Sequence, residues 1–281
     1  ISSSYLFGLR NTILLLPPIC AFYFLSALST STRKTLSISF LLFGYLSFFH
    51  IYRYFTDYEK NSHSFINILM MQIPRCIYYN WFINSEAHTA QKGKISKRSF
   101  LDYFFYIFNF VGILTGPVYN YEEHLNMMKS ASQQQGRKEK LYKLLLTLAG
   151  FLFIYVAFSL HLPGWEWVAT SEFGSYNILY RVLLISLFMI LIRSKYYILW
   201  TIADITAVLS NLKNADTNFS TFINNNNIYE IELNLSTKSR IDNWNISIAR
   251  WLRKCFYLPL NASCGLNKEN ASLITFLLSA L

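Results

Sequence analysis

The feature that most constrains this chain is a series of apolar blocks, each close to the length that crosses a lipid bilayer. A transmembrane helix needs about 20 consecutive, mostly apolar residues. The blocks occupy residues 5–28, 36–55, 64–83, 100–119, 141–162 and 178–192, with the last extending towards residue 200. Only 14% of the residues are charged, whereas soluble proteins carry about 25%. We therefore predict an all-α, polytopic transmembrane helical protein, with residues 1–281 forming a single domain.

Two of the blocks are weaker candidates for full membrane spans. Residues 64–83 contain Pro74 and Arg75, which is typical of a tilted, interfacial or re-entrant helix. If residues 100–118 also crossed, the basic loop at 92–98 would be lumenal, against the tendency of Lys and Arg to remain cytoplasmic. We therefore expect that one of these two blocks does not cross completely.

The basic residues indicate how the chain lies in the membrane. A net charge of +10 would suggest a nucleic-acid partner for a soluble domain, but here the basic residues lie between apolar blocks. There they favour a cytoplasmic location and contact with anionic headgroups. The loop at 163–175 contains Glu166 and Glu172 but no Lys or Arg, so we predict that it is lumenal. The segment 241–260 then lies on the cytosolic side, and no nucleic-acid partner is expected.

The cysteines and the chain ends lead to two further expectations. The four cysteines show no Cys-x-x-Cys pair and no metal-ligand spacing, so we predict free thiols, mostly within the membrane, and no metal site. The sequence begins at Ile1 and ends at Leu281 inside an apolar run, and we expect it to be a fragment of a longer polypeptide.

Residues 241–260, IDNWNISIARWLRKCFYLPL, combine an apolar stripe with several cations. The apolar positions at helical spacing are Trp244, Ile248, Trp251 and Cys255. The cations off this face are Arg250, Arg253 and Lys254. Trp rings at headgroup depth and cations near phosphate are typical of an interfacial helix, which needs no chemistry.

Asn245 is not explained by an interfacial helix alone. An unpaired amide near membrane depth is costly, and the start of a helix suits an N-cap, an ordinary structural role for Asn. An amide donor beside aromatic walls and cations would equally suit a phosphate-bearing substrate with a reacting carbonyl. The residues by themselves leave both interpretations open.

Three ordered segments resemble the membrane-bound O-acyltransferase (MBOAT) family. WNISIARWLRKCFY, residues 244–257, is similar to the Trp-Asn helix of that family, in which Trp-Leu and a Tyr follow. RSKYYILWTIADI, residues 193–205, resembles the Tyr-Tyr-x-x-Trp helix of its lysophospholipid branch. FVGILTGPVYNYEEHLNMM, residues 110–128, is similar to the Gly-Pro segment after the early helices. The resemblance covers residues 100–281 and implies the fold of that family.

The resemblance implies transfer of a fatty acyl group from acyl-CoA to the free hydroxyl of a lysophospholipid. It gives a catalytic role to Asn245, paired with a histidine in a following membrane helix that acts as general base. The residues expected to bind substrate are Trp244, Arg250, Trp251, Arg253, Lys254, Tyr197 and Trp200. The structural alternatives are a membrane-surface role for the cations and helix packing for Tyr197 and Trp200. Acyl-CoA is a co-substrate, and no cofactor is expected.

The expected histidine does not occur in the sequence after Asn245. The five histidines are His50, His63, His88, His124 and His161. The resemblance places a Trp-His-Gly motif just beyond Leu281, and we interpret the upstream histidines as structural, with His124 in a loop and His161 at the end of a span. A relative that has lost catalysis is the alternative.

Two stretches of the sequence indicate which lysophospholipid is the acceptor. GILTGPVYNYEEHL and IYEIELNLSTKSRIDNWN most resemble lysophosphatidylinositol acyltransferases of the family, so lysophosphatidylinositol is favoured over the choline, ethanolamine and serine lysolipids. The expected setting is phospholipid remodelling by a multi-pass protein of the endoplasmic reticulum membrane, with membrane lipids as partners. A transporter is the competing class, but the blocks at 141–162 and 178–192 carry few ionisable residues.

Overall fold

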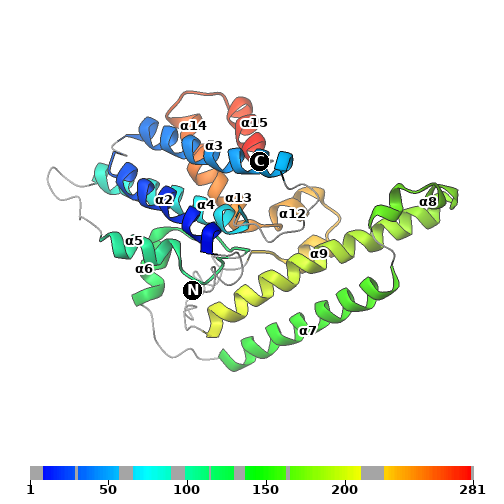
Figure 1. The fold of residues 1–281 in the computed structure, drawn as a ribbon. Helices are drawn as coiled ribbons and strands as arrows, with labels where there is room; N and C mark the ends of the chain where they lie inside the picture. Colours follow the sequence, from blue (N-terminus) through cyan, green and yellow to red (C-terminus); the bar gives the residue numbers. More distant parts are fainter. Residues whose placement is uncertain are drawn as a thin grey trace.

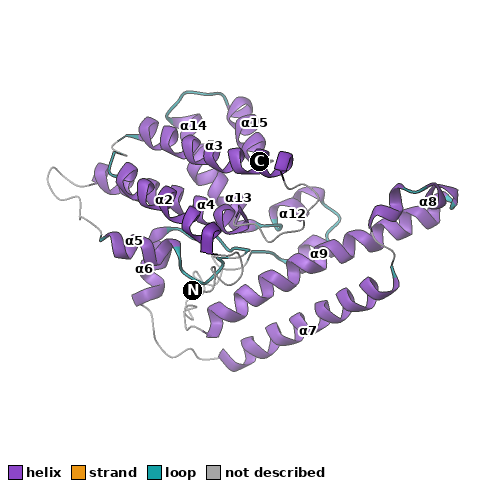
Figure 2. Ribbon diagram, in the orientation of Figure 1, coloured by secondary structure: helices purple, strands orange, loops and turns teal. Residues whose placement is uncertain are grey.

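The computed structural model describes residues 9–28, 31–56, 66–89, 99–113, 115–129, 137–162, 165–209 and 225–279. Helices are the only regular secondary structure in these ranges, which confirms the all-α prediction (Figure 2). The long helices are α2 (Leu9–Ser26), α3 (Thr32–Thr56), α4 (Ile66–Thr89), α7 (Arg137–His161) and α9 (Ile178–Leu209). The shorter ones are α5 (Phe100–Ile107), α6 (Tyr121–Lys129), the 3₁₀ helix η1 (Trp165–Ala169), α8 (Ser171–Ser175), α11 (Ile228–Leu233), α12 (Thr237–Asp242), α13 (Ile246–Leu252), the π-helix η2 (Arg253–Tyr257), α14 (Leu258–Ala262) and α15 (Lys268–Ser279).

Three of the described helices are long and apolar enough to cross a membrane. They are Thr32–Phe55, Lys138–His161 and Ile178–Leu209. The predicted blocks at 36–55, 141–162 and 178–192 are thereby confirmed as helices of spanning length. The helix that contains the last block, α9, extends beyond it to Leu209. The block at 5–28 contains α2, a helix of 18 residues, and its crossing of the membrane stays a prediction.

The predicted block at 100–119 is not a membrane span. Its helix, α5, is only eight residues long, and the chain then turns back on itself. Gly112 lies in this turn with a φ of +68°, and a Cβ there would be 2.6 Å from the backbone carbon of Gly116. The expectation that one of the two weak blocks does not cross is confirmed. The basic loop at 92–98 that motivated it lies outside the described residues.

The block at 64–83 forms part of α4, a single continuous helix of 24 residues in the middle of the bundle. Arg75, on this helix, is 0% exposed. Its guanidinium group donates to the backbone carbonyls of Ile107 at 3.1 Å, Asn109 at 2.8 Å and Val111. It also lies 4.9 Å from the centroid of the Tyr119 ring. A re-entrant helix is therefore not needed to accommodate the charge, because carbonyl groups of the protein accept hydrogen bonds from both terminal nitrogens of the guanidinium group.

Figure 1 shows a helical bundle and a hairpin that extends from it. The bundle contains α2 to α6 and α13 to α15, whereas the hairpin consists of α7 and α9, with α8 near its far end. Large apolar side chains are exposed along both hairpin helices, and they include Leu146, Phe153, Leu160, Leu179 and Val182. Apolar surface of this extent on two helices of spanning length suits contact with lipid. The lumenal location of the loop at the far end stays a prediction.

The four cysteines are free thiols, as predicted. Cys76 and Cys255 are buried among the helices, Cys20 is half-buried, and Cys264 is exposed in the turn before α15. The Sγ atom of Cys76 lies 3.3 Å from the hydroxyl oxygen of Tyr103. The two buried thiols, Cys76 and Cys255, therefore act as small packing groups.

Candidate active site

The Trp-Asn pair lies in a tight turn between two short helices. It follows the end of α12 and precedes the start of α13. The N–H group of Trp244 donates to the carbonyl of Ile241 at 3.2 Å, so Trp244 belongs to the turn. The prediction of one helix from Trp244 to Tyr257 is therefore wrong at its start, because the left-handed backbone of Asn245 interrupts it.

Asn245 has an unusual backbone conformation. Its φ and ψ are both 50°, and among the described residues it is the only non-glycine residue with a positive φ. Asn tolerates this left-handed region better than most residues. Asn245 occupies the N-cap position of α13, but its side chain makes no capping hydrogen bond within the described part of the chain. The structural interpretation of Asn245 as a conventional cap is therefore wrong, and its amide group is not used for capping.

Aromatic side chains from distant segments surround the turn. The ring of Trp244 lies 4.9 Å from that of Trp200, 5.5 Å from that of Tyr196 and 6.0 Å from that of Tyr197, measured between centroids. The indole N–H group of Trp200 donates to the carbonyl of Thr115 at 3.0 Å. The three segments singled out in the sequence, 110–128, 193–205 and 244–257, therefore meet at the Trp-Asn turn.

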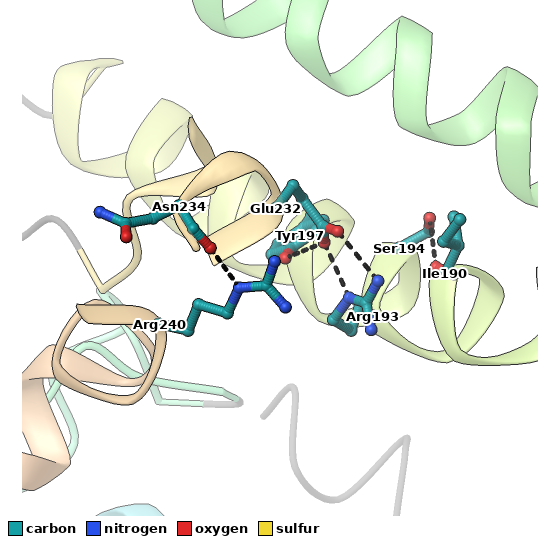
Figure 3. A network of polar contacts seen from close by, with 7 residues as sticks. All are labelled: Ile190, Arg193, Ser194, Tyr197, Glu232, Asn234 and Arg240. Atoms are coloured by element: carbon teal, nitrogen blue, oxygen red, sulfur yellow. Dashed lines mark hydrogen bonds and ion pairs between the residues drawn. The ribbon is translucent and has the colours of Figure 1, made fainter. Parts of the chain in front are cut away.

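A charged network fastens the hairpin beside this turn (Figure 3). Arg193 donates to both carboxylate oxygens of Glu232, at 2.7 and 2.9 Å, and the Tyr197 hydroxyl donates to one of them at 2.6 Å. Burial alone would raise the pKa of Glu232, but the hydrogen bonds from Arg193 and Tyr197 outweigh it and hold that pKa below its usual value. The sequence analysis missed Glu232, although it lies in the acidic stretch IYEIEL shortly before the Trp-Asn pair.

The apolar stripe of the Trp-Asn segment faces the protein and not the lipid. Trp251 is 3% exposed and stacks on Phe43 of α3, with ring centroids 5.8 Å apart, and Cys255 is also buried. After α13 the helix widens into η2, in which the N–H group of Leu258 reaches back to the carbonyl of Arg253. The interfacial interpretation of this segment is therefore wrong for its apolar face. Tyr197 and Trp200 are similarly buried, and substrate contact by these side chains stays a prediction.

The predicted cations divide between two cavities. Arg250 and Arg253 line a cavity of about 650 Å³ that α13 and η2 form with α15. Lys254 lines a separate cavity of about 570 Å³ against α4 and α6, here called the α4–α6 cavity. Neighbouring positions along α13 and η2 thus line two different cavities. Their contact with phosphate stays a prediction.

The α4–α6 cavity combines aromatic, amide and charged side chains. Its lining residues are Tyr78, Trp81, Phe82, Asn84, Ser85, Asn120, Tyr121, Glu122 and Lys254. Asn84 is 5% exposed, and neither its Oδ1 atom nor the indole nitrogen of Trp81 has a hydrogen-bond partner in the described ranges. Buried polar atoms are usually paired, so unpaired ones in a cavity wall are suited to a polar ligand.

The helix α6 beside this cavity is fixed by a reciprocal cap. The N–H group of Asn120 donates to Oε2 of Glu123 at 2.7 Å, and the N–H group of Glu123 donates to Oδ1 of Asn120 at 2.8 Å. Burial raises the pKa of Glu123. His124 follows on the same helix and is 5% exposed, so its prediction as a loop residue is wrong. His161 lies at the exposed end of α7, as predicted.

His124 is expected to make the fold sensitive to acid. Burial, with a smaller contribution from Arg75, lowers the pKa of His124 to about 4, whereas an unfolded imidazole titrates at about 6.5. The unfolded chain therefore binds more protons between these values, and this contribution to stability, complete above pH 6.5, is lost as the pH falls towards 4. The thermal midpoint in detergent should fall less between pH 7 and pH 5 for His124→Phe than for the unaltered protein. Equal falls in both proteins would contradict the assignment.

The described residues thus combine helices of membrane-spanning length with a Trp-Asn turn, an adjoining aromatic cluster and two lined cavities. Residues 19–281 match the family model described as MBOAT, membrane-bound O-acyltransferase family. The chain therefore belongs to the membrane-bound O-acyltransferase family.

Several relatives within the family are similar over most of this chain. It is 26% identical over 277 residues to membrane-bound glycerophospholipid O-acyltransferase 2 of Homo sapiens, covering 85% of this chain and 51% of that protein. It is 25% identical over 279 residues to membrane-bound glycerophospholipid O-acyltransferase 1 of Mus musculus, covering 86% and 54%. It is 22% identical over 281 residues to a lysophospholipid acyltransferase of Schizosaccharomyces pombe, covering 92% and 55%. The chain thus spans about half the length of these relatives.

Proposed function

We propose that this protein transfers a fatty acyl group from acyl-CoA to the free hydroxyl of a lysophospholipid. The relatives named as glycerophospholipid and lysophospholipid acyltransferases support the choice of acceptor. The observation that carries the proposal is the geometry of Asn245, whose amide is not used for capping and which lies in a left-handed turn next to the aromatic cluster.

In the proposed reaction, the hydroxyl oxygen of the lysolipid attacks the thioester carbon. The new ester C–O bond forms as the C–S bond breaks, and a histidine takes the hydroxyl proton and passes it to the leaving sulfur of CoA. General-base assistance of this kind contributes about 10²–10⁴-fold. Asn245 orients the substrates or stabilises the negative charge that develops on the carbonyl oxygen. The histidine is part of the proposal because the family resemblance implies it, and every assay uses protein expressed from the whole reading frame that encodes this chain.

The proposed site of action is the cytosolic side of the endoplasmic reticulum membrane, where a multi-pass protein meets both acyl-CoA and membrane lipids. Arg250 and Arg253 in one cavity and Lys254 in the other are the proposed phosphate contacts. Trp244 is the proposed aromatic wall beside Asn245. Acyl-CoA enters as a co-substrate, and we propose no bound cofactor.

Two acceptor headgroups are candidates. The sequence of the Gly-Pro segment and of the stretch before Trp244 favours lysophosphatidylinositol. The α4–α6 cavity favours a zwitterionic headgroup, as in lysophosphatidylcholine or lysophosphatidylethanolamine, because Lys254 suits a phosphate while Glu122 and the Trp81 ring suit an ammonium group. The amides and hydroxyl group of Asn84, Ser85 and Asn120 would bind an inositol ring equally well.

A headgroup panel tests the proposal and separates these candidates. Membranes containing the protein are incubated with labelled acyl-CoA and lysolipids that carry inositol, choline, ethanolamine or serine. We expect transfer, with lysophosphatidylinositol as the best acceptor, and we expect Lys254→Gln to raise KM for the acceptor about tenfold, the loss of one charged hydrogen bond. Glu122→Gln should lower transfer only for the acceptors that carry an ammonium group, which are the choline, ethanolamine and serine lysolipids. No transfer to any lysolipid would overturn the proposed function.

A further inference from the structure

We propose that Asn225 is a positioning residue for Asn245: it caps α13 in place of Asn245 and so leaves the Asn245 amide available to substrate. This inference rests on the proposed function. Asn225 lies 20 residues before Asn245 in the sequence, at the start of the segment that leads into α11. Nothing in the sequence pattern distinguishes it from the neighbouring asparagines.

Asn225 supplies the acceptors that the first turn of α13 requires. Its backbone carbonyl accepts from the N–H group of Ile246 at 2.9 Å, and its Oδ1 atom accepts from the N–H group of Ser247 at 3.1 Å. The first N–H groups of a helix have no partner within the helix and are usually served by the side chain of the N-cap residue. Here a residue from another segment performs that role, and the N-cap residue does not.

Asn225 is buried beside the first turn of α13. It is 2% exposed, and its Nδ2 atom has no hydrogen-bond partner among the described residues. The Ser247 hydroxyl, also buried, accepts from the N–H group of Val118 at 3.1 Å. The Gly-Pro segment, the start of α11 and the start of α13 are therefore joined at one point.

The capping of α13 by Asn225 has a direct consequence for the turn at Asn245. A residue that caps its own helix normally has an extended backbone and directs its side chain at the helix N–H groups. Asn245 instead takes a left-handed backbone, and its carbonyl accepts from the N–H groups of Ile248 and Ala249, each at 3.1 Å. Its amide is then free of the helix. Without the acceptors of Asn225, the Asn245 side chain would be drawn into the vacant capping role.

The experiment compares variants that differ in the Oδ1 acceptor. Asn225→Asp keeps an acceptor at this atom, whereas Asn225→Leu and Asn225→Ala remove it. We expect both of the latter to lower kcat at least tenfold with KM for acyl-CoA and lysolipid changed less than twofold. Asn225→Asp should retain kcat within threefold of the unaltered protein. Misfolding would instead lower the amount of active enzyme, and titration of bound acyl-CoA in each preparation measures that amount, to which kcat is normalised.

A second arm tests whether Asn225 acts through Asn245. Because residues that act as a unit are not additive, Asn225→Ala should cause no further loss in an Asn245→Gly background. The inference is overturned if Asn225→Ala leaves kcat unchanged, if Asn225→Asp loses as much as Asn225→Leu, or if the losses in the double variant multiply. Full activity of Asn245→Gly alone would instead overturn the catalytic assignment in the proposed function, whatever the Asn225 variants show.

Discussion

Replacing Asn245 by glycine is expected to lower acyl transfer at least 100-fold while the protein accumulates and unfolds as before. Glycine adopts the left-handed backbone of this turn without strain. The substitution therefore removes the amide and little else. Loss of one donor that stabilises a developing oxyanion costs about 10²–10³ in kcat. The measurement is kcat in detergent or membranes, normalised to bound acyl-CoA, together with the thermal unfolding midpoint.

Asn245→Ala is the matched control for the backbone. Alanine lacks the amide but resists the left-handed conformation, at a cost of about 1–2 kcal/mol. It should lose transfer as the glycine variant does, and it should also unfold at a lower temperature. A glycine variant with normal transfer would show that the Asn245 amide has no catalytic role.

Replacing Arg75 by methionine is expected to prevent accumulation of correctly folded protein. Methionine fills a similar volume but donates no hydrogen bonds, so the carbonyls of Ile107, Asn109 and Val111 would lose their donor. Each buried polar group left without a partner costs about 1–3 kcal/mol. The sum approaches the whole stability of a typical domain, about 5–15 kcal/mol. The measurement is the monodisperse fraction in size-exclusion chromatography after detergent extraction.

Two further variants make the Arg75 test specific. Arg33→Met alters an exposed arginine on α3 and should leave the monodisperse fraction unchanged. Arg75→Lys keeps the charge but cannot reach several carbonyls at once, so it should give an intermediate yield. Normal yield and unfolding of Arg75→Met would contradict the role assigned to this side chain.

The long apolar helices and the three motif segments could be predicted from the sequence because their signals are local. Hydrophobic length identified α3, α7 and α9, and the quoted motifs identified the segments that meet at Trp244. The apolar block at 100–119 is longer than its helix because hydropathy counts apolar residues and takes no account of turns. The helix α5 ends at Ile107, and the turn at Gly112 follows, although the composition remains apolar.

The partners that organise the site could not be predicted because they are distant in the sequence. The contact between Arg193 and Glu232 and the capping of Ser247 by Asn225 both depend on tertiary structure, and no periodic pattern encodes them. The left-handed conformation of Asn245 is a similar case. Asn is a common N-cap, but the sequence left the role of Asn245 open between a cap and a substrate contact, and the acceptors that Asn225 supplies from another segment carry no local signal.

The π-helix η2 has a consequence for the comparison of this protein with others. A π-turn is equivalent to one extra residue inserted into an α-helix. A relative with a regular α-helix here is therefore expected to be one residue shorter between Trp251 and Leu260, both of which are buried in this protein. If an alignment places this gap elsewhere, each intervening residue is matched to one that lies about 100° away around the helix. Lys254, which lines the α4–α6 cavity, would then be matched to a residue of the relative that faces the other cavity.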